Sequence, residues 1–229
     1  MEKNKKSFVF VSKVAFASIA ISLTLASYFE VNFLVIPLRI VVLPSLMLVY
    51  FLSSNVKSII YLTALFFATI SNILFIYSTL EFIYAGLISF LVFRAIVLYQ
   101  IYKDCEKVYW VSFFLGFFLF SIPNAYLFYI TSISLGSIFY FGLANILLNA
   151  IIGGISISSY SNNSSLANTS LLISSLLFVV LSVLFIIQKF YIFIQVYEPL
   201  RVIVLLSAHY FYFYYLIFTE KSKAKNHLF

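Results

Sequence analysis

The chain has 229 residues, of which 64% are hydrophobic, 21% are aromatic and only 9% are charged. A soluble domain of this length cannot bury so much apolar surface, because the ratio of surface to volume limits the buried fraction. The composition therefore excludes an ordinary soluble domain and indicates a protein that spans a membrane. The formal net charge of +7 comes mostly from lysines in short tails and loops. These lack the interleaved aromatic and base-reading groups of a nucleic-acid site, so no nucleic-acid partner is predicted.

Eight apolar segments follow one another along the chain, each close to the roughly 20 residues that a helix needs to cross a bilayer. They are continuously apolar, whereas the strands of a membrane barrel alternate between apolar and polar residues. We therefore predict an all-α membrane protein, a bundle of about eight transmembrane helices. The expected spans are 8–29, 33–52, 58–77, 82–102, 108–130, 136–158, 169–188 and 197–218. The linkers are too short to hold another domain, so residues 1–229 are expected to form a single membrane domain.

One low-complexity polar stretch interrupts this pattern. Residues 158–168 read SSYSNNSSLAN, a composition that predicts a flexible loop between the sixth and seventh spans.

Lysine placement predicts the orientation of the bundle. With an even number of spans both termini lie on one side, and that side collects Lys3, Lys5, Lys6, Lys57, Lys103, Lys107, Lys221, Lys223 and Lys225. The opposite connections carry only Lys189, with Glu30, Glu81 and Glu198. By the positive-inside rule both termini are cytoplasmic. The abundance of Phe, Ile, Tyr, Ser and Asn favours an AT-rich bacterial genome, and hence an inner membrane. The first 29 residues also resemble a signal peptide, but their apolar run is longer than a usual signal core, so we expect a retained helix.

The single cysteine, Cys105, has no second cysteine to pair with. A disulfide framework and a cysteine zinc site within one chain are therefore excluded. The two histidines are His209, in the last span, and His227, in the tail, so neither adjoins Cys105 in sequence. No cofactor and no metal are predicted.

Charged and polar residues at membrane depth are the best candidates for a site, because charge is costly there and usually faces a cavity or a partner. Three arginines qualify: Arg39, Arg94 and Arg201. Glu198 precedes Arg201 by three residues on the same helical face, so the two can pair. Together with His209, Asn72 and Ser182, these residues suggest a cavity open to the outer leaflet.

Structural alternatives stand beside that interpretation. Arg39 and Arg201 can extend to the outer headgroups. Asn72 and Ser182 can simply bond neighbouring helices. His209 and the tyrosines that follow it, beginning with Tyr210, can form an interfacial aromatic belt.

Three stretches resemble the lysoplasmalogenase (YhhN-type) membrane family. They are residues 64–100, ALFFATISNILFIYSTLEFIYAGLISFLVFRAIVLYQ; residues 177–190, LFVVLSVLFIIQKF; and residues 209–217, HYFYFYYLI. The resemblance implies a bundle of eight spans and a presumed catalytic pair of aspartates that hydrolyses the vinyl-ether bond of lysoplasmalogens. Those aspartates fall on Asn72 and Ser182, and the family histidine falls on Arg94, while Tyr210 matches.

Asn72 and Ser182 cannot supply the carboxyl groups that acid and base catalysis of this reaction requires. We therefore expect a divergent member that binds a lysophospholipid or another anionic lipid, with weak or no hydrolase activity. The expected ligand-binding residues are Asn72, Arg94, Ser182, Glu198, Arg201, His209 and Tyr210. Membrane lipids are the expected partners. The main alternative is a non-enzymatic membrane subunit that packs against other membrane proteins. A transporter is a further alternative, and it would require broken helices or an inverted repeat.

The orientation is the first testable prediction. Reporters fused to the N-terminus and, separately, to the C-terminus should both be located in the cytoplasm, because the lysine asymmetry favours that side strongly. A periplasmic C-terminus would contradict both the even number of spans and the orientation.

Overall fold

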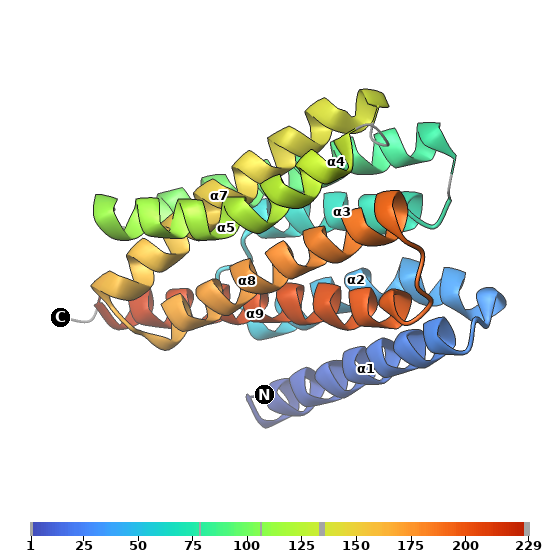
Figure 1. Cartoon of the computed structure of the whole chain (residues 1–229). Helices are drawn as coiled ribbons and strands as arrows, with labels where there is room; N and C mark the ends of the chain where they lie inside the picture. Colours follow the sequence, from blue (N-terminus) through green and yellow to red (C-terminus); the bar gives the residue numbers. More distant parts are fainter. Residues whose placement is uncertain (1, 78, 106, 133–135, 227–229) are drawn as a thin grey trace.

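Helices make up all the regular secondary structure among the described residues of the computed structural model, 2–77, 79–105, 107–132 and 136–226 (Figure 1). The elements are α1 (Glu2–Tyr28), α2 (Asn32–Ser53), α3 (Ile59–Leu74), α4 (Leu80–Asp104), α5 (Trp110–Ile130), the 3-10 turn η1 (Gly136–Ile138), α7 (Phe139–Asn162), α8 (Leu166–Ile186), the π-helical turn η2 (Ile187–Tyr191) and α9 (Tyr197–Asn226). Seven of these helices are long and apolar enough to cross a membrane, and α3 is a shorter apolar helix of 16 residues. The predicted all-α membrane bundle is confirmed.

Consecutive long helices run in opposite directions along the bundle, so the start of α1 and the end of α9 face the same end (Figure 1). The tightest neighbours are the successive pairs α1–α2, α3–α4, α5–α7 and α8–α9. α9 lies most deeply, with 56% of its most apolar stretch buried, whereas α1 has 17% and α5 has 22%. The central helices are therefore the ones placed to carry a site, and α1 and α5 form outer walls.

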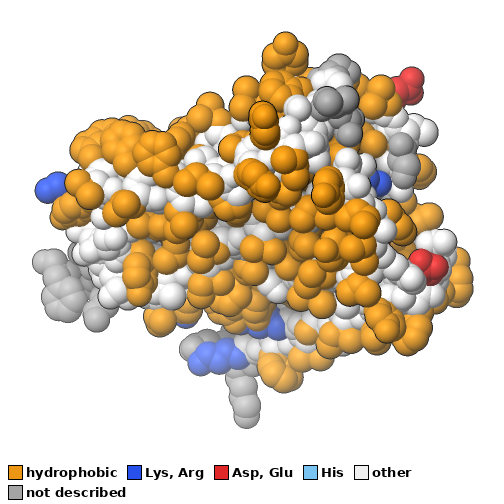
Figure 2. All heavy atoms as spheres, in the orientation of Figure 1, with side chains coloured by type: hydrophobic (Ala, Val, Ile, Leu, Met, Phe, Trp, Pro, Cys, Tyr) orange, Lys and Arg blue, Asp and Glu red, His pale blue; other side chains and the backbone are white. Residues whose placement is uncertain are grey.

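The surface suits a lipid environment. Figure 2 shows a face that is almost wholly hydrophobic, with the few visible charged side chains near its edges. Large apolar side chains on α1 and α5 point outward, for example Phe10, Phe114 and Phe118, which are at least half exposed. In water such a surface would aggregate, whereas in a bilayer it meets acyl chains.

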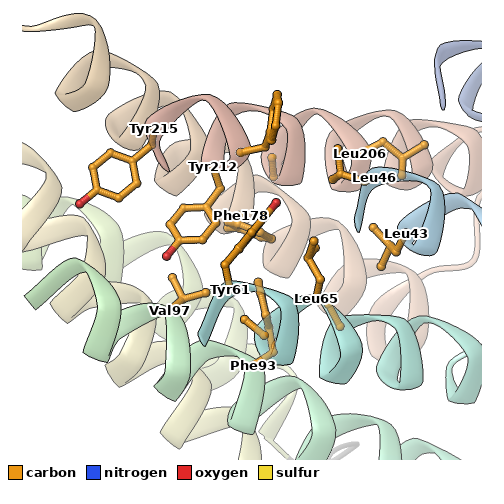
Figure 3. Packing of buried hydrophobic residues seen from close by; sticks show 14 of the residues in the cluster. Leu43, Leu46, Tyr61, Leu65, Phe93, Val97, Phe178, Leu206, Tyr212 and Tyr215 are labelled. Carbon is orange, nitrogen blue, oxygen red and sulfur yellow. The ribbon is translucent and has the colours of Figure 1, made fainter. Parts of the chain in front are cut away.

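The hydrophobic core lies between α2, α3, α4, α8 and α9. Figure 3 shows Tyr61, Phe93, Phe178 and Tyr212, one from each of α3, α4, α8 and α9, grouped in one layer. At the α5–α7 contact the helices approach through small residues: a Cβ added to Gly116 would lie 2.9 Å from the carbonyl oxygen of Gly153. Small residues allow this close approach, which is a common way for membrane helices to associate.

The predicted loop over residues 158–168 is wrong. α7 continues to Asn162 and α8 begins at Leu166, which leaves three residues between them. The polar residues stabilise the helix ends: the Ser165 side chain accepts from the Asn168 backbone N–H, and the Asn168 amide donates to the carbonyls of Ser159 and Asn163. Serine and asparagine favour such capping positions, which explains a polar composition without a long loop.

Several expected spans have different ends. The expected span 58–77 stops as a helix at Leu74, and the chain continues in a turn, in which the N–H groups of Ile76 and Tyr77 bond the carbonyls three residues earlier. The expected span 169–188 begins earlier, at Leu166, and changes to a π-helical turn after Ile186. The last helix extends beyond 218, to Asn226.

Candidate functional site

A cavity of about 90 Å³ lies between the helices, with room for several water molecules or a short piece of acyl chain. Most of its residues come from the later halves of α3 and α8 and from the first halves of α2, α4, α7 and α9, and Phe128, near the end of α5, also lines it. Because consecutive helices are antiparallel, all these halves lie toward the end of the bundle opposite the termini. The wall is mainly apolar, and its polar lining residues are Arg39, Ser71, Asn72, Asn145, Ser182, Arg201 and His209.

One carboxylate organises the charged side of the cavity. Glu198 Oε2 accepts a hydrogen bond from Arg39 Nη2 at 3.0 Å, and Oε1 lies 3.5 Å from Arg201 Nη1. Gln188 closes the cluster, since its amide nitrogen donates to Glu198 Oε1 at 3.0 Å and its oxygen accepts from Arg201 Nη1 at 2.7 Å. The predicted pairing of Glu198 with Arg201 is confirmed. Both arginines are 8% exposed, and their guanidinium groups contact Glu198 within the protein.

The π-helical turn η2 positions Gln188. A π-helix carries more residues per turn than an α-helix, and such turns often occur at functional sites. Here the turn follows α8 directly and leaves Gln188 5% exposed. The chain then reverses, and Glu198 stands in the first turn of α9. Residues ten apart in sequence thus meet across the reversal.

Asn72 and Ser182 line the cavity and also bond neighbouring helices. Asn72 donates to the backbone carbonyl of Arg39 at 3.1 Å. Ser182 Oγ accepts from Asn149 Nδ2 at 3.0 Å and, more weakly, from Asn145 Nδ2 at 3.5 Å. The two asparagines were missed by the sequence interpretation, although two asparagines four residues apart in an apolar span are a visible signal.

His209 lies at the inner end of the cavity. It is fully buried, and neither ring nitrogen has a hydrogen-bond partner among the described residues. Its ring packs against Phe93 and Phe178, with both centroid distances 5.1 Å. The alternative of an interfacial aromatic belt is therefore wrong for this residue, because α9 continues past it for four further turns.

Arg94 does not line the cavity. It lies in the neighbouring layer, fully buried, with its guanidinium carbon 4.0 Å from the centroid of Phe178 and 4.9 Å from that of Phe90, which does line the cavity. Tyr210 also lies elsewhere. Its hydroxyl is 3.1 Å from that of Tyr214, and its ring stacks on Phe16 of α1. The structure thus brings together Asn72, Ser182, Arg201 and His209, with Glu198 behind the arginines.

Metal binding has no support in this part of the molecule: the described residues contain no group of three or more His, Cys, Asp or Glu that could hold a metal ion. Comparisons of the chain with protein-family models, with curated proteins and with solved structures give no match. The chemistry of the site is therefore inferred from its own geometry, a charged cluster beside an apolar cavity.

Replacing Glu198 by alanine should destabilise the protein by roughly 2–4 kcal/mol, because two buried arginines lose their counter-charge. Asp104→Ala is the matched control. It removes one ion pair, with Lys223 at 2.6 Å, in which the lysine side chain is 57% exposed and the aspartate side chain 12%, and it should cost less than the loss of Glu198 because the lysine stays hydrated. Unfolding of both variants in detergent micelles measures the difference. An equal loss in the free energy of unfolding for the two variants would contradict a central role for Glu198.

Proposed function

We propose that this integral membrane protein binds an anionic single-chain lipid, such as a lysophospholipid, with its headgroup at the arginine cluster and its chain in the cavity. The observation that carries the proposal is the position of Arg39 and Arg201, which line the same cavity as a wall of apolar side chains. An amphiphile is the class of ligand that satisfies both surfaces at once.

The cluster retains a positive charge. Two arginines share one carboxylate, so the group carries about one net positive charge, and Lys189 lies next to Gln188 in η2. Nε of Arg39 is buried and has no hydrogen-bond partner among the described residues. A phosphate placed here would receive charge-assisted hydrogen bonds in a medium of low dielectric constant, where such bonds are strong.

The depth and apolar lining of the cavity suit one narrow chain. Arg201 and His209 both line it and are eight residues apart on α9, which corresponds to about 12 Å along the helix axis. Between them the wall includes Leu205 from α9, with Phe185 and Leu181 from α8. With the termini in the cytoplasm, as the lysines predict, the charged end faces the outer leaflet, from which a lysolipid can enter.

Hydrolysis is not part of the proposed function, although the sequence resembles the lysoplasmalogenase family. The positions of the presumed catalytic aspartates hold Asn72 and Ser182, and neither can deliver a proton to an alkenyl carbon efficiently. Glu198 is the carboxylate beside the cavity. It accepts hydrogen bonds from Arg39 and Gln188, which favours its ionised form and makes it a poor proton donor.

Purified protein should therefore show little or no release of aldehyde from a lysoplasmalogen, measured against a matched preparation without the protein. Asn72→Ala and Glu198→Gln serve as controls for any residual rate. A robust rate that survives Glu198→Gln would show that the family's catalytic positions have been assigned wrongly.

Binding itself can be measured by native mass spectrometry with lysophosphatidylglycerol and with a neutral monoacylglycerol of the same chain length. Wild-type protein should prefer the anionic lipid. Arg201→Gln should weaken that binding about tenfold or more, because one charge-assisted hydrogen bond contributes roughly 1.5–3 kcal/mol, and should change monoacylglycerol binding little.

Lys57→Gln is the matched charge control, since Lys57 is exposed beside the Phe51 ring in the connection after α2, at the opposite end of the bundle. Equal weakening in the Arg201 and Lys57 variants, or a preference for the neutral lipid, would contradict the proposal.

A further inference from the structure

Arg94 presents hydrogen-bond donors that the described part of the chain leaves unused. The aromatic rings of Phe178, Phe90 and Phe93 lie 4.0, 4.9 and 5.8 Å from its guanidinium carbon. An aromatic ring attracts a cation to its face, but it does not accept the hydrogen bonds that the N–H groups donate in the plane of the guanidinium. Nε and Nη2 of Arg94 are buried and have no hydrogen-bond partner among the described residues.

His209 supplies further unused polar atoms beside Arg94. Both side chains contact the same two rings, Phe93 and Phe178, so they belong to one layer between α4, α8 and α9. Both are completely buried, and both nitrogens of His209 are without a partner in the described part of the chain. The cavity reaches this layer, because His209 and Phe90 line it.

No ion pair found among the described residues includes Arg94. Glu198 pairs with Arg39 and Arg201, Asp104 pairs with Lys223, and Glu220 accepts from Tyr50 and Ser54. The other acidic residues, Glu2, Glu30, Glu81 and Glu106, stand at the chain start or at the ends of spans in sequence. A buried guanidinium with free in-plane donors therefore lacks a counter-charge among the described residues, although such groups normally have one.

We propose that Arg94 and His209 together bind a compact anion at the inner end of the cavity, either a halide ion or the carboxylate of a fatty acid. The adjacent Nε and Nη2 of the guanidinium form a fork that matches a carboxylate or a spherical anion. A neutral imidazole adds one N–H donor. This site is separate from the Arg39 and Arg201 cluster, so it does not depend on binding of a phospholipid headgroup there.

The chain has only two histidines, His209 and His227, so NMR of protein labelled with ¹⁵N-histidine can report on the site directly. The protein, in a neutral detergent at constant ionic strength with a bulky organic anion, is titrated with bromide and, separately, with decanoate. We expect a saturable shift of the His209 signals while those of His227 stay in place. A response to bromide identifies a small-anion site, and a response to decanoate alone identifies a carboxylate site.

Variants test whether Arg94 is responsible. Arg94→Gln should abolish the shift, and Arg94→Lys, which keeps the charge but loses the fork, should weaken the apparent affinity at least several-fold. Arg201→Gln should leave the bromide response unchanged, which separates this site from the proposed headgroup site. No His209 shift with either anion would overturn the proposal from the wild-type titration alone, and so would a shift that persists unchanged in Arg94→Gln.

Discussion

Charge inside a bilayer must be compensated within the protein, and the ion cluster on Glu198 meets this requirement at one end of the bundle. Its carboxylate accepts a hydrogen bond from Arg39 of α2 and lies beside Arg201 of α9. Gln188 of the π-helical turn bonds both Glu198 and Arg201. The cluster fixes where α2, η2 and α9 meet. The charged wall of the cavity depends on this cluster, because Glu198 contacts both arginines that line the cavity and Gln188 bonds Arg201 as well.

Polar bonds also hold the rest of α9 in register with its neighbours. Near the C-terminal end of α9, Glu220 accepts hydrogen bonds from the hydroxyl groups of Tyr50, in α2, and Ser54, the C-cap of α2. An acidic residue near each end of α9 therefore bonds α2 or its cap. Between them Ser174 of α8 donates to the Ala208 carbonyl at 2.8 Å. In a membrane the hydrophobic effect does not favour one helix pairing over another, so such bonds and close packing decide it. Arg94 is the exception, since its Nε and Nη2 have no acceptor among the described residues.

The local features of the fold could be predicted from the sequence, whereas the contacts between distant residues could not. Eight apolar runs predict eight helices, and a spacing of three residues predicts the Glu198–Arg201 pair. The Arg39–Glu198 bond joins residues 159 apart in sequence, and no local pattern predicts it. Gln188 was missed because it lies in a π-helical turn, which sets the direction of its side chain. A spacing of 3.6 residues per turn does not predict that direction. The polar stretch 158–168 was misassigned because serine and asparagine are equally typical of loops and of helix caps.

The two positions that the sequence resemblance aligns with aspartates, Asn72 and Ser182, differ in what they would offer a carboxylate. Ser182 accepts from the amides of Asn149 and Asn145, so an acid there would find two donors already in place. Asn72 instead donates to the carbonyl oxygen of Arg39, and an ionised acid at that position would lose this bond and face another acceptor. Asn72 is thus the residue whose hydrogen bond is specific to an amide. The packing of α3 on α2 at this point is built around a donor, and an ionised carboxylate in place of the amide could not supply one.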